Sequence, residues 1–209
     1  SADSRPITVG ETVHAAIDHL RRERIRRNHT ATHILQWALR LVLGEHVKQS
    51  GSFVSPERLR FDFTHFEGMT PDQLAKVERM VNAKIMEDHP VRAYETSLAS
   101  AREAGVTALF GEKYGDVVRV LEIGNFSKEL CGGTHVARTT EIGLLRILAE
   151  GSVGANLRRI EAATSFDALE AVRVEEAVLA AAADALKVRP TEVAEKVAAL
   201  QKRLREAEK

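Results

Sequence analysis

The sequence predicts an α+β fold: a mainly antiparallel sheet packed with helices, followed by C-terminal helices that begin a coiled coil. Three observations support this prediction. Apolar residues from Leu20 to about His46 have helical spacing, and the short apolar segments after them lack the alternation of strand and helix that a parallel sheet requires. After Ser165 the composition becomes rich in alanine. An apolar content of 44% in 209 residues is enough for a hydrophobic core.

The order of the elements follows from apolar periodicity and from turn residues. Residues 12–18 alternate apolar and polar side chains, as a half-buried strand does. Thr70-Pro71-Asp72-Gln73 has the N-cap, first-turn proline and capping-box residue of a helix that we expect to end near Asp88. The remaining predictions are a long helix over 20–46, a hairpin over 47–54 and 59–63, a strand over 91–96, a short helix ending at Gly105, and strands over 117–123, 142–149 and 157–163.

Two helices are predicted at the C-terminal end. The first continues to Lys187 and is interrupted at 188–190, after which Thr191 is the expected N-cap of the second. Apolar residues of the second helix recur at the spacing of a coiled-coil seam. They are Val193, Val197, Leu200, Leu204 and Ala207. Because the seam covers only about two heptads, we expect it to pack on the helix over 165–187 or to pair weakly between chains.

Composition and charge restrict the classes of function. Lysine plus arginine and aspartate plus glutamate both total 30, so any contact with nucleic acid must come from a local patch. No apolar run approaches the ~20 residues of a membrane span, and the first residues lack a signal-peptide pattern. A single cysteine fits a reducing cytosol, so we expect a cytoplasmic protein that does not bind membranes. No P-loop or GxGxxG motif supports nucleotide hydrolysis.

Two pairs of residues spaced four apart offer the side chains that bind zinc. His29 and His33 lie on the predicted long helix, where residues four apart share one face. Cys131 and His135 flank the Gly-Gly turn of CGGTH, where the missing side chains allow a close approach of the backbone. Either pair alone is more often chance or core packing, but together they supply the four ligands of a tetrahedral site, and we expect one Zn²⁺ per chain. The other histidines are interpreted as ordinary surface or core residues. They are at positions 14, 19, 46, 65 and 89.

The histidine pair does not have the form found in zinc proteases. In those enzymes a glutamate follows the first histidine and acts as the base, whereas here Thr30, Ala31 and Thr32 lie between the two histidines. Peptide hydrolysis is therefore not expected. An ester, which is a more activated substrate, needs less help from the protein.

Several segments resemble the editing domain of bacterial alanyl-tRNA synthetases, in matching order. They are NHTATHIL (28–35), VKQSGSFV (47–54), RLRFDF (58–63), ALFGEKYGD (108–116), FSKELCGGTHV (126–136) and LRRIEAAT (157–164). The resemblance covers nearly the whole chain, and ELCGGTH is highly specific. The sequence departs from the pattern at Asn125, where an aspartate is expected, and at Ser165, where a glycine is usual.

The resemblance implies an enzyme that hydrolyses the ester bond of mischarged Ser-tRNA(Ala) and Gly-tRNA(Ala). It implies that His29, His33, Cys131 and His135 are zinc ligands and that the zinc binds and orients the substrate. It places Gln49 on the glutamine that positions the substrate, so Gln49 and Cys131 are the candidate catalytic residues. The candidate substrate-binding residues are Thr30, Thr32, Gln49 and Gly132. The threonines are more often helix caps or surface residues.

An arginine-rich segment suggests where tRNA would bind. Five arginines lie within residues 21–27, just before His29. Such runs are usually solvated helix faces, but their placement beside the site favours contact with phosphate, with Arg22, Arg26 and Arg27 as candidates. The expected partners are the acceptor end of tRNA(Ala) and the rest of a synthetase chain that is absent here. We expect this piece to be mostly monomeric and the longer protein to dimerise.

The resemblance also divides the chain into three parts. Residues 1–18 would be the end of a preceding editing barrel or a linker strand, residues 19–164 the zinc-dependent editing core, and residues 165–209 a helical linker. Two alternatives stay open. One is a free-standing aminoacyl-tRNA deacylase of the same fold, and the other is a non-catalytic zinc-stapled module for tRNA binding or dimerisation.

Overall fold

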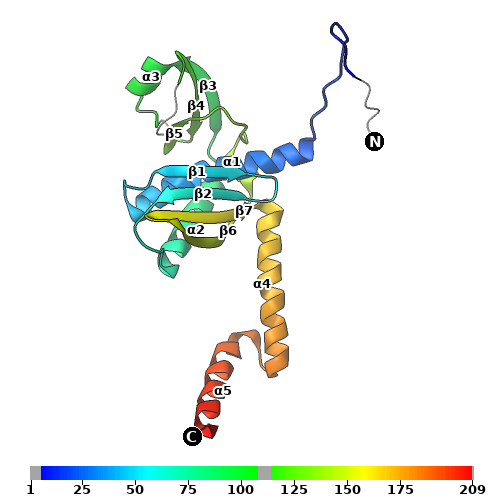
Figure 1. Ribbon diagram of the computed structural model, residues 1–209, viewed down its shortest axis with the longest axis vertical. Coiled ribbons are helices and arrows are strands. Elements are labelled where there is room, and N and C mark those ends of the chain that lie inside the picture. The colour runs from blue at the N-terminus through cyan, green and yellow to red at the C-terminus, as the bar shows by residue number, and fades with distance from the viewer. Residues whose placement is uncertain (1–5, 108–113, 209) are drawn as a thin grey trace.

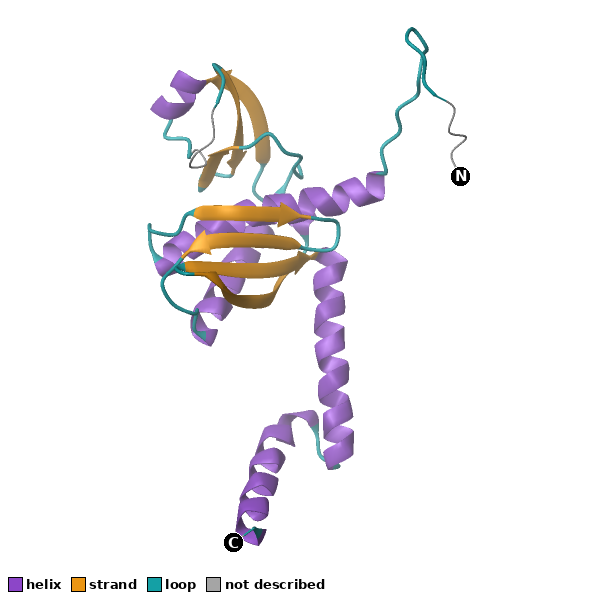
Figure 2. Ribbon diagram, viewed as in Figure 1, coloured by secondary structure: helices purple, strands orange, loops and turns teal. Residues whose placement is uncertain are grey.

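Two antiparallel sheets and five α-helices build the part of the chain that the computed structural model describes, residues 6–107 and 114–208 (Figures 1 and 2). This arrangement confirms the predicted α+β class, although the strands form two sheets and not one. In these two ranges no helix is both long enough and apolar enough to span a membrane.

The larger sheet has the strand order β1-β2-β7-β6, and all its neighbours are antiparallel. The bounds are β1 Gln49–Val54, β2 Leu59–Thr64, β6 Leu145–Gly154 and β7 Leu157–Thr164. Helices α1 (His19–Leu43) and α2 (Pro71–Met86) pack against this sheet. Leu59, Phe61 and Phe63 alternate along β2 and are fully buried, because successive side chains of a strand point to opposite faces.

The smaller sheet has the strand order β3-β4-β5, with β3 at Val91–Ser97, β4 at Val117–Ile123 and β5 at Ser127–Leu130. Helix α3 (Leu98–Glu103) packs on it through Ala101, which belongs to a small separate apolar cluster. Figure 1 shows this sheet beyond the β1 edge of the larger one, and α1 contacts strands of both. Strand β5 and the 3₁₀ turn η1 (Thr139–Ile142) were not predicted from the sequence.

The predicted strand over 12–18 is wrong. These residues form an exposed extended segment that leads into α1, and the side chains of Val13 and Ile17 are 56% and 48% exposed. The alternation of apolar residues was real, but a strand also needs a neighbour for its backbone hydrogen bonds, and these residues pair with none of the described strands. Helix α1 begins after Asp18, whose carboxylate accepts a hydrogen bond from the Arg21 amide at 2.9 Å.

The two C-terminal helices have the expected positions but not the expected packing. Helix α4 spans Ser165–Leu186, the 3₁₀ turn η2 spans Pro190–Glu192, and α5 spans Val193–Ala207. Thr191 lies inside the 3₁₀ turn, so its predicted role as N-cap is wrong. Figure 2 shows α5 diverging from α4 after the turn, which leaves Leu200 and Leu204 39% and 59% exposed. Of the two expected arrangements, packing of these leucines on α4 is therefore not formed, and weak pairing between chains stays a prediction.

Candidate metal centre and adjoining pocket

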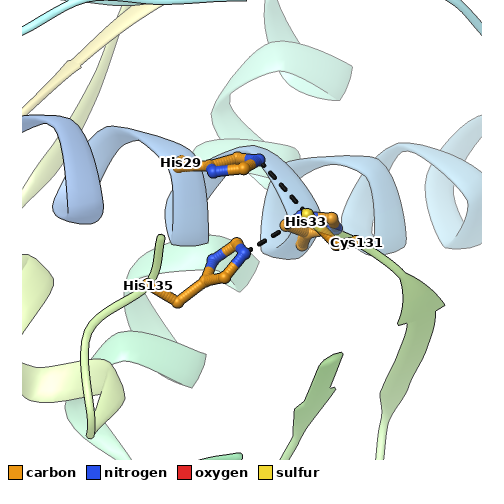
Figure 3. Close-up of side chains that lie close together, drawn as sticks. All are labelled: His29, His33, Cys131 and His135. Carbon is orange, nitrogen blue, oxygen red and sulfur yellow. Dashed lines mark hydrogen bonds between the residues drawn. The ribbon is translucent and has the colours of Figure 1, made fainter. Parts of the chain in front are cut away.

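The four predicted zinc ligands lie together (Figure 3). Helix α1 supplies His29 and His33 from one face, and the loop after β5 supplies Cys131 and His135. One ligand atom from each residue lies within 4.8 Å of all the others. The Cys131 Sγ is 3.5 Å from Nε2 of His29 and 3.3 Å from Nε2 of His135. Residues about 100 positions apart in the sequence therefore converge on one point.

The CGGTH loop reaches α1 because it contains glycine at the point of closest approach. A Cβ at Gly133 would lie 2.5 Å from Nδ1 of His29, which is far inside van der Waals contact, whereas a Cβ at Gly132 would have no atom within 4 Å. The side chain of Arg119, on β4, donates hydrogen bonds to the backbone carbonyls of Cys131 and Gly133. The Cys131 amide in turn donates to the Arg119 carbonyl at 3.0 Å. The loop is thus fixed to the smaller sheet.

Two of the histidines have a second partner on the side of the ring away from the cluster. Nδ1 of His33 is 2.8 Å from a carboxylate oxygen of Glu129, and Nδ1 of His135 is 3.2 Å from the Thr30 hydroxyl. Both partners are buried. These contacts turn Nε2 of each ring toward Cys131.

The electrostatics of the cluster favour a thiolate. Burial raises the pKa of the Cys131 thiol, but hydrogen bonds with His135 and His29 outweigh burial and lower that pKa to about 3. Burial lowers the pKa of His135 to about 4, so its ring is neutral at pH 7. Burial also disfavours a charge on His33, but the Glu129 carboxylate opposes it and raises the pKa of His33 to about 10. A thiolate and a neutral imidazole are the forms that bind metal, so Cys131 and His135 already have the binding form, whereas His33 must release its second proton when a metal binds.

The geometry of these residues fits a zinc ion. Zinc bonds of about 2.0–2.1 Å to nitrogen and 2.3 Å to sulfur at a tetrahedral angle place the two ligand atoms about 3.6 Å apart. The two Sγ–Nε2 distances of 3.5 and 3.3 Å are close to this value. In addition, Nε2 of His33 is buried and has no hydrogen-bond partner among the described residues, as expected for an atom that binds a metal. Three nitrogens and one thiolate are a donor set compatible with zinc.

A pocket of about 370 Å³ opens beside the metal ligands, which is within the usual size range of small-ligand sites. It lies between α1, β1, β4 and β5. Gln49, Thr32 and Gly132 line it, as do Ser52 and Arg119. The Gln49 side-chain amide donates to the Ser52 hydroxyl at 3.3 Å, so β1 presents both polar groups to the same space. Of the motif over 108–116, residues 108–113 lie outside the described part of the chain.

The other candidate residues are placed differently. Thr30 is fully buried behind His135 and does not line the pocket. Arg26 pairs with Glu23, and Nε of Arg27 donates to the Glu141 carbonyl, so both guanidinium groups contact protein. Arg22 is exposed and lines a cavity of about 210 Å³ that also includes Thr134 of the CGGTH loop. Of the three candidate tRNA-binding arginines, Arg22 has the side chain most available to contact a phosphate.

Among the residues that the sequence analysis did not select are Glu129 and Arg119, which line the pocket, and Asn28, which supports helix α1 near the cluster. Asn28 is buried and donates from its amide to the Ser55 and Pro56 carbonyls, which fixes α1 to the β1–β2 turn. For Glu129 a signal existed, because it precedes Cys131 by two positions and such residues share one face of a strand. For Arg119 and Asn28 the contacts are long-range or to backbone, and nothing local in the sequence marks them.

Comparison with known proteins places the chain among tRNA synthetases. Residues 118–161 match the family described as the second additional domain of threonyl and alanyl tRNA synthetases. The chain is 53% identical over 198 residues to an alanine–tRNA ligase of Pelotomaculum thermopropionicum, covering 95% of this chain and 23% of that protein. It is 51% identical over 203 residues to the alanine–tRNA ligase of Carboxydothermus hydrogenoformans, covering 97% and 23%. The chain thus spans about a quarter of the length of the curated relatives it matches.

Proposed function

We propose that this chain, which belongs to the alanyl-tRNA synthetase family through its second additional domain, is a proofreading deacylase. Its substrates would be Ser-tRNA(Ala) and Gly-tRNA(Ala), and the reaction would be hydrolysis of the aminoacyl ester. The observation that carries the proposal is the polar pocket containing Gln49, which opens directly beside the His29, His33, Cys131 and His135 cluster. We further propose that it acts in the cytoplasm, within protein synthesis.

The limited selectivity of an alanine-binding pocket supports the assignment of serine and glycine esters as substrates. A hydrophobic pocket that selects alanine discriminates against one added hydroxyl or one missing methylene by only about 1–3 kcal/mol. A second pocket that destroys the wrong product supplies the remaining selectivity. Polar groups that line the present pocket, including the Thr32 and Ser52 hydroxyls and the Gln49 amide, suit a small polar aminoacyl group such as serine.

The residues of the site have distinct roles in this proposal. His29, His33, Cys131 and His135 would hold one Zn²⁺ per chain, which would supply Lewis acidity to the amine or carbonyl of the aminoacyl group. Gln49 would hold the aminoacyl group through its side-chain amide, from the β1 side of the pocket. The Thr32 hydroxyl donates to the Asn28 carbonyl at 2.8 Å, so toward a substrate it can only accept a hydrogen bond. Gly132 leaves open space at the pocket wall.

Positioning accounts for the catalysis better than a strong base does. An aminoacyl ester is already reactive, so fixing it and a water in near-attack geometry removes much of the entropic barrier. Four protein ligands would leave no standing position for a metal-bound water, so the metal would contact the aminoacyl group only as an added ligand, which favours orientation of the substrate over generation of hydroxide.

For tRNA, we propose that the acceptor end approaches along the N-terminal half of α1. Arg22 lines the same cavity as Thr134 of the CGGTH loop, and Thr134 immediately precedes the proposed ligand His135. Arg26 and Arg27 would contribute less, because each already contacts a protein group. Replacing Arg22 by a neutral residue should weaken tRNA binding to a similar extent for all RNA sequences, and should reduce the dependence of that binding on salt concentration.

The alternative of a non-catalytic zinc-stapled module has less support. A purely structural zinc site needs no cavity beside it, whereas this cluster lines a pocket with a candidate positioning glutamine. The alternative of a free-standing deacylase also has less support, since the relatives named above are ligases.

Single substitutions test the proposal through release of serine from Ser-tRNA(Ala). Cys131→Ala should abolish release, because it removes a metal ligand, and Gln49→Ala should slow release or change the preference between serine and glycine. Gln201→Ala, on the exposed side of α5, is the matched control for the glutamine substitution and should match the wild-type rate. Serine release at the wild-type rate by Cys131→Ala would contradict the proposed site.

A further inference from the structure

We propose that Glu129 and Thr30 are positioning residues that hold His33 and His135 in the orientation and tautomer needed for metal binding, while His29 is held less firmly. His33, His135 and Cys131 would then contribute more to the metal affinity than His29. This inference rests on the proposed function only in taking the cluster to be a metal site.

The argument for Thr30 follows from counting its hydrogen bonds. Its hydroxyl has one proton, which it donates to the Arg26 carbonyl at 2.9 Å. The hydroxyl oxygen accepts from the Val136 amide at 3.2 Å, so toward Nδ1 of His135, also at 3.2 Å, it can only accept. Nδ1 of His135 must therefore carry the proton. The free lone pair of this ring is then on Nε2, which faces Cys131 at 3.3 Å.

Glu129 acts on His33 in the same way, from the opposite side of the cluster. One carboxylate oxygen accepts from Nδ1 of His33 at 2.8 Å, and the other accepts from the Ser127 hydroxyl at 3.0 Å. All three residues are buried. With both oxygens occupied, the carboxylate has a single orientation, and the His33 ring bound to it presents Nε2 inward.

His29 lacks a comparable support. Among the hydrogen bonds of the described residues, its ring takes part only in the contact with Cys131. The ring is half-buried, lines the pocket, and packs against the open backbone of Gly133. Pre-orientation lowers the entropic cost of binding, so an unsupported ligand contributes less to affinity than a supported one.

Zinc affinity, measured by competition with a chromophoric chelator, tests the proposal. Thr30→Val keeps the shape of the side chain but removes the acceptor, and should weaken zinc binding about 10–100-fold. Thr30→Ser keeps the hydroxyl and should restore near-wild-type affinity. Thr139→Val is the matched control, since Thr139 is also fully buried, donates to the Lys84 carbonyl and accepts from the His89 amide, and has no hydrogen bond to any of the four proposed ligands. Its zinc affinity should not change.

For Glu129, the same measurement is made on Glu129→Gln and Glu129→Ala. Zinc affinity should decrease in the order wild type, Gln, Ala, because Gln retains an acceptor for Nδ1 of His33 but not the charge. Likewise, His33→Ala should lose more affinity than His29→Ala.

Two further readouts separate positioning from a loss of folding. The melting temperature of metal-free Thr30→Val should fall, because the Val136 amide loses its acceptor, but circular dichroism should show a folded protein at the temperature of the zinc titration. The visible absorption of the Co²⁺-loaded variants should shift, since the ligand field senses ring orientation. Wild-type zinc affinity in both Thr30→Val and Glu129→Ala, or equal losses for His29→Ala and His33→Ala, would overturn the inference. If the wild-type chain itself bound no zinc, the proposed metal site would fail, and this outcome is distinct from the others.

Discussion

Gly133→Ala is a minimal change that should weaken zinc binding at the proposed metal centre. The added Cβ would lie 2.5 Å from Nδ1 of His29 and still closer to its Cε1. Non-bonded carbon and nitrogen atoms need about 3.5 Å, so the loop and the ring must separate by about 1 Å to relieve the Nδ1 contact, and by about 1.5 Å to relieve the closer contact with Cε1. Metal–ligand distances tolerate deviations of only about 0.2 Å. The methyl group must therefore displace either His29 or the loop that bears Cys131 and His135.

The expected loss of zinc affinity in Gly133→Ala is at least the ~10–100-fold seen when ligand orientation is disturbed. A chelator-competition titration measures it, with elemental analysis of the purified protein as a check. Gly132→Ala is the control, because a Cβ there meets no atom within 4 Å, and it should bind zinc as the wild type does. Equal zinc affinity in the Gly133→Ala and wild-type proteins would refute the placement of His29 against this loop.

Three other predictions address stability and assembly. Burial, and then the neighbouring His46, lowers the pKa of His65 from its usual 6.5, so the folded state favours the neutral ring. The free energy of unfolding should therefore be highest above pH 6.5 and decrease as the pH falls below it. Urea unfolding measures this. The free energy of unfolding of His65→Gln should depend less on pH than that of the wild type, whereas the exposed His14→Gln should keep the wild-type pH dependence. Ser165 has a left-handed φ of 55°, so Ser165→Gly should raise the free energy of unfolding by about 1 kcal/mol, and a decrease would show that its side chain matters more than its backbone. Leu200→Lys should leave both the sedimentation of a mostly monomeric chain and serine release unchanged, and a dimer that dissociates on this change would contradict the expectation that the chain is mostly monomeric.

The four residues of the candidate metal site could be selected from the sequence because their spacing and chemistry are local properties. Two histidines four apart on a helix share a face whatever surrounds them, and a Gly-Gly turn between Cys131 and His135 permits a tight loop. The meeting of the two pairs depends on the tertiary structure. It was inferred because a tetrahedral zinc site requires four ligands. The structure confirms the meeting.

The features that sequence reasoning missed depend on long-range partners. The segment 12–18 has a strand-like pattern but no strand beside it among the described residues, and pairing is what makes a strand. Strand β5 was missed because a glutamate interrupts its apolar pattern, and the buried Glu129 is paired with His33 of a distant helix and with the Ser127 hydroxyl. The seam of α5 has coiled-coil periodicity, but periodicity alone does not specify which surface covers it.

Hydrolysis of Ser-tRNA(Ala) and Ala-tRNA(Ala), with and without removal of the metal, tests the central claim most directly. We predict that the zinc-loaded chain releases serine faster than alanine, that chelation stops serine release, and that added Zn²⁺ restores it. Serine release at an undiminished rate by protein shown to be zinc-free by elemental analysis would contradict the account, as would failure of the zinc-loaded chain to hydrolyse Ser-tRNA(Ala).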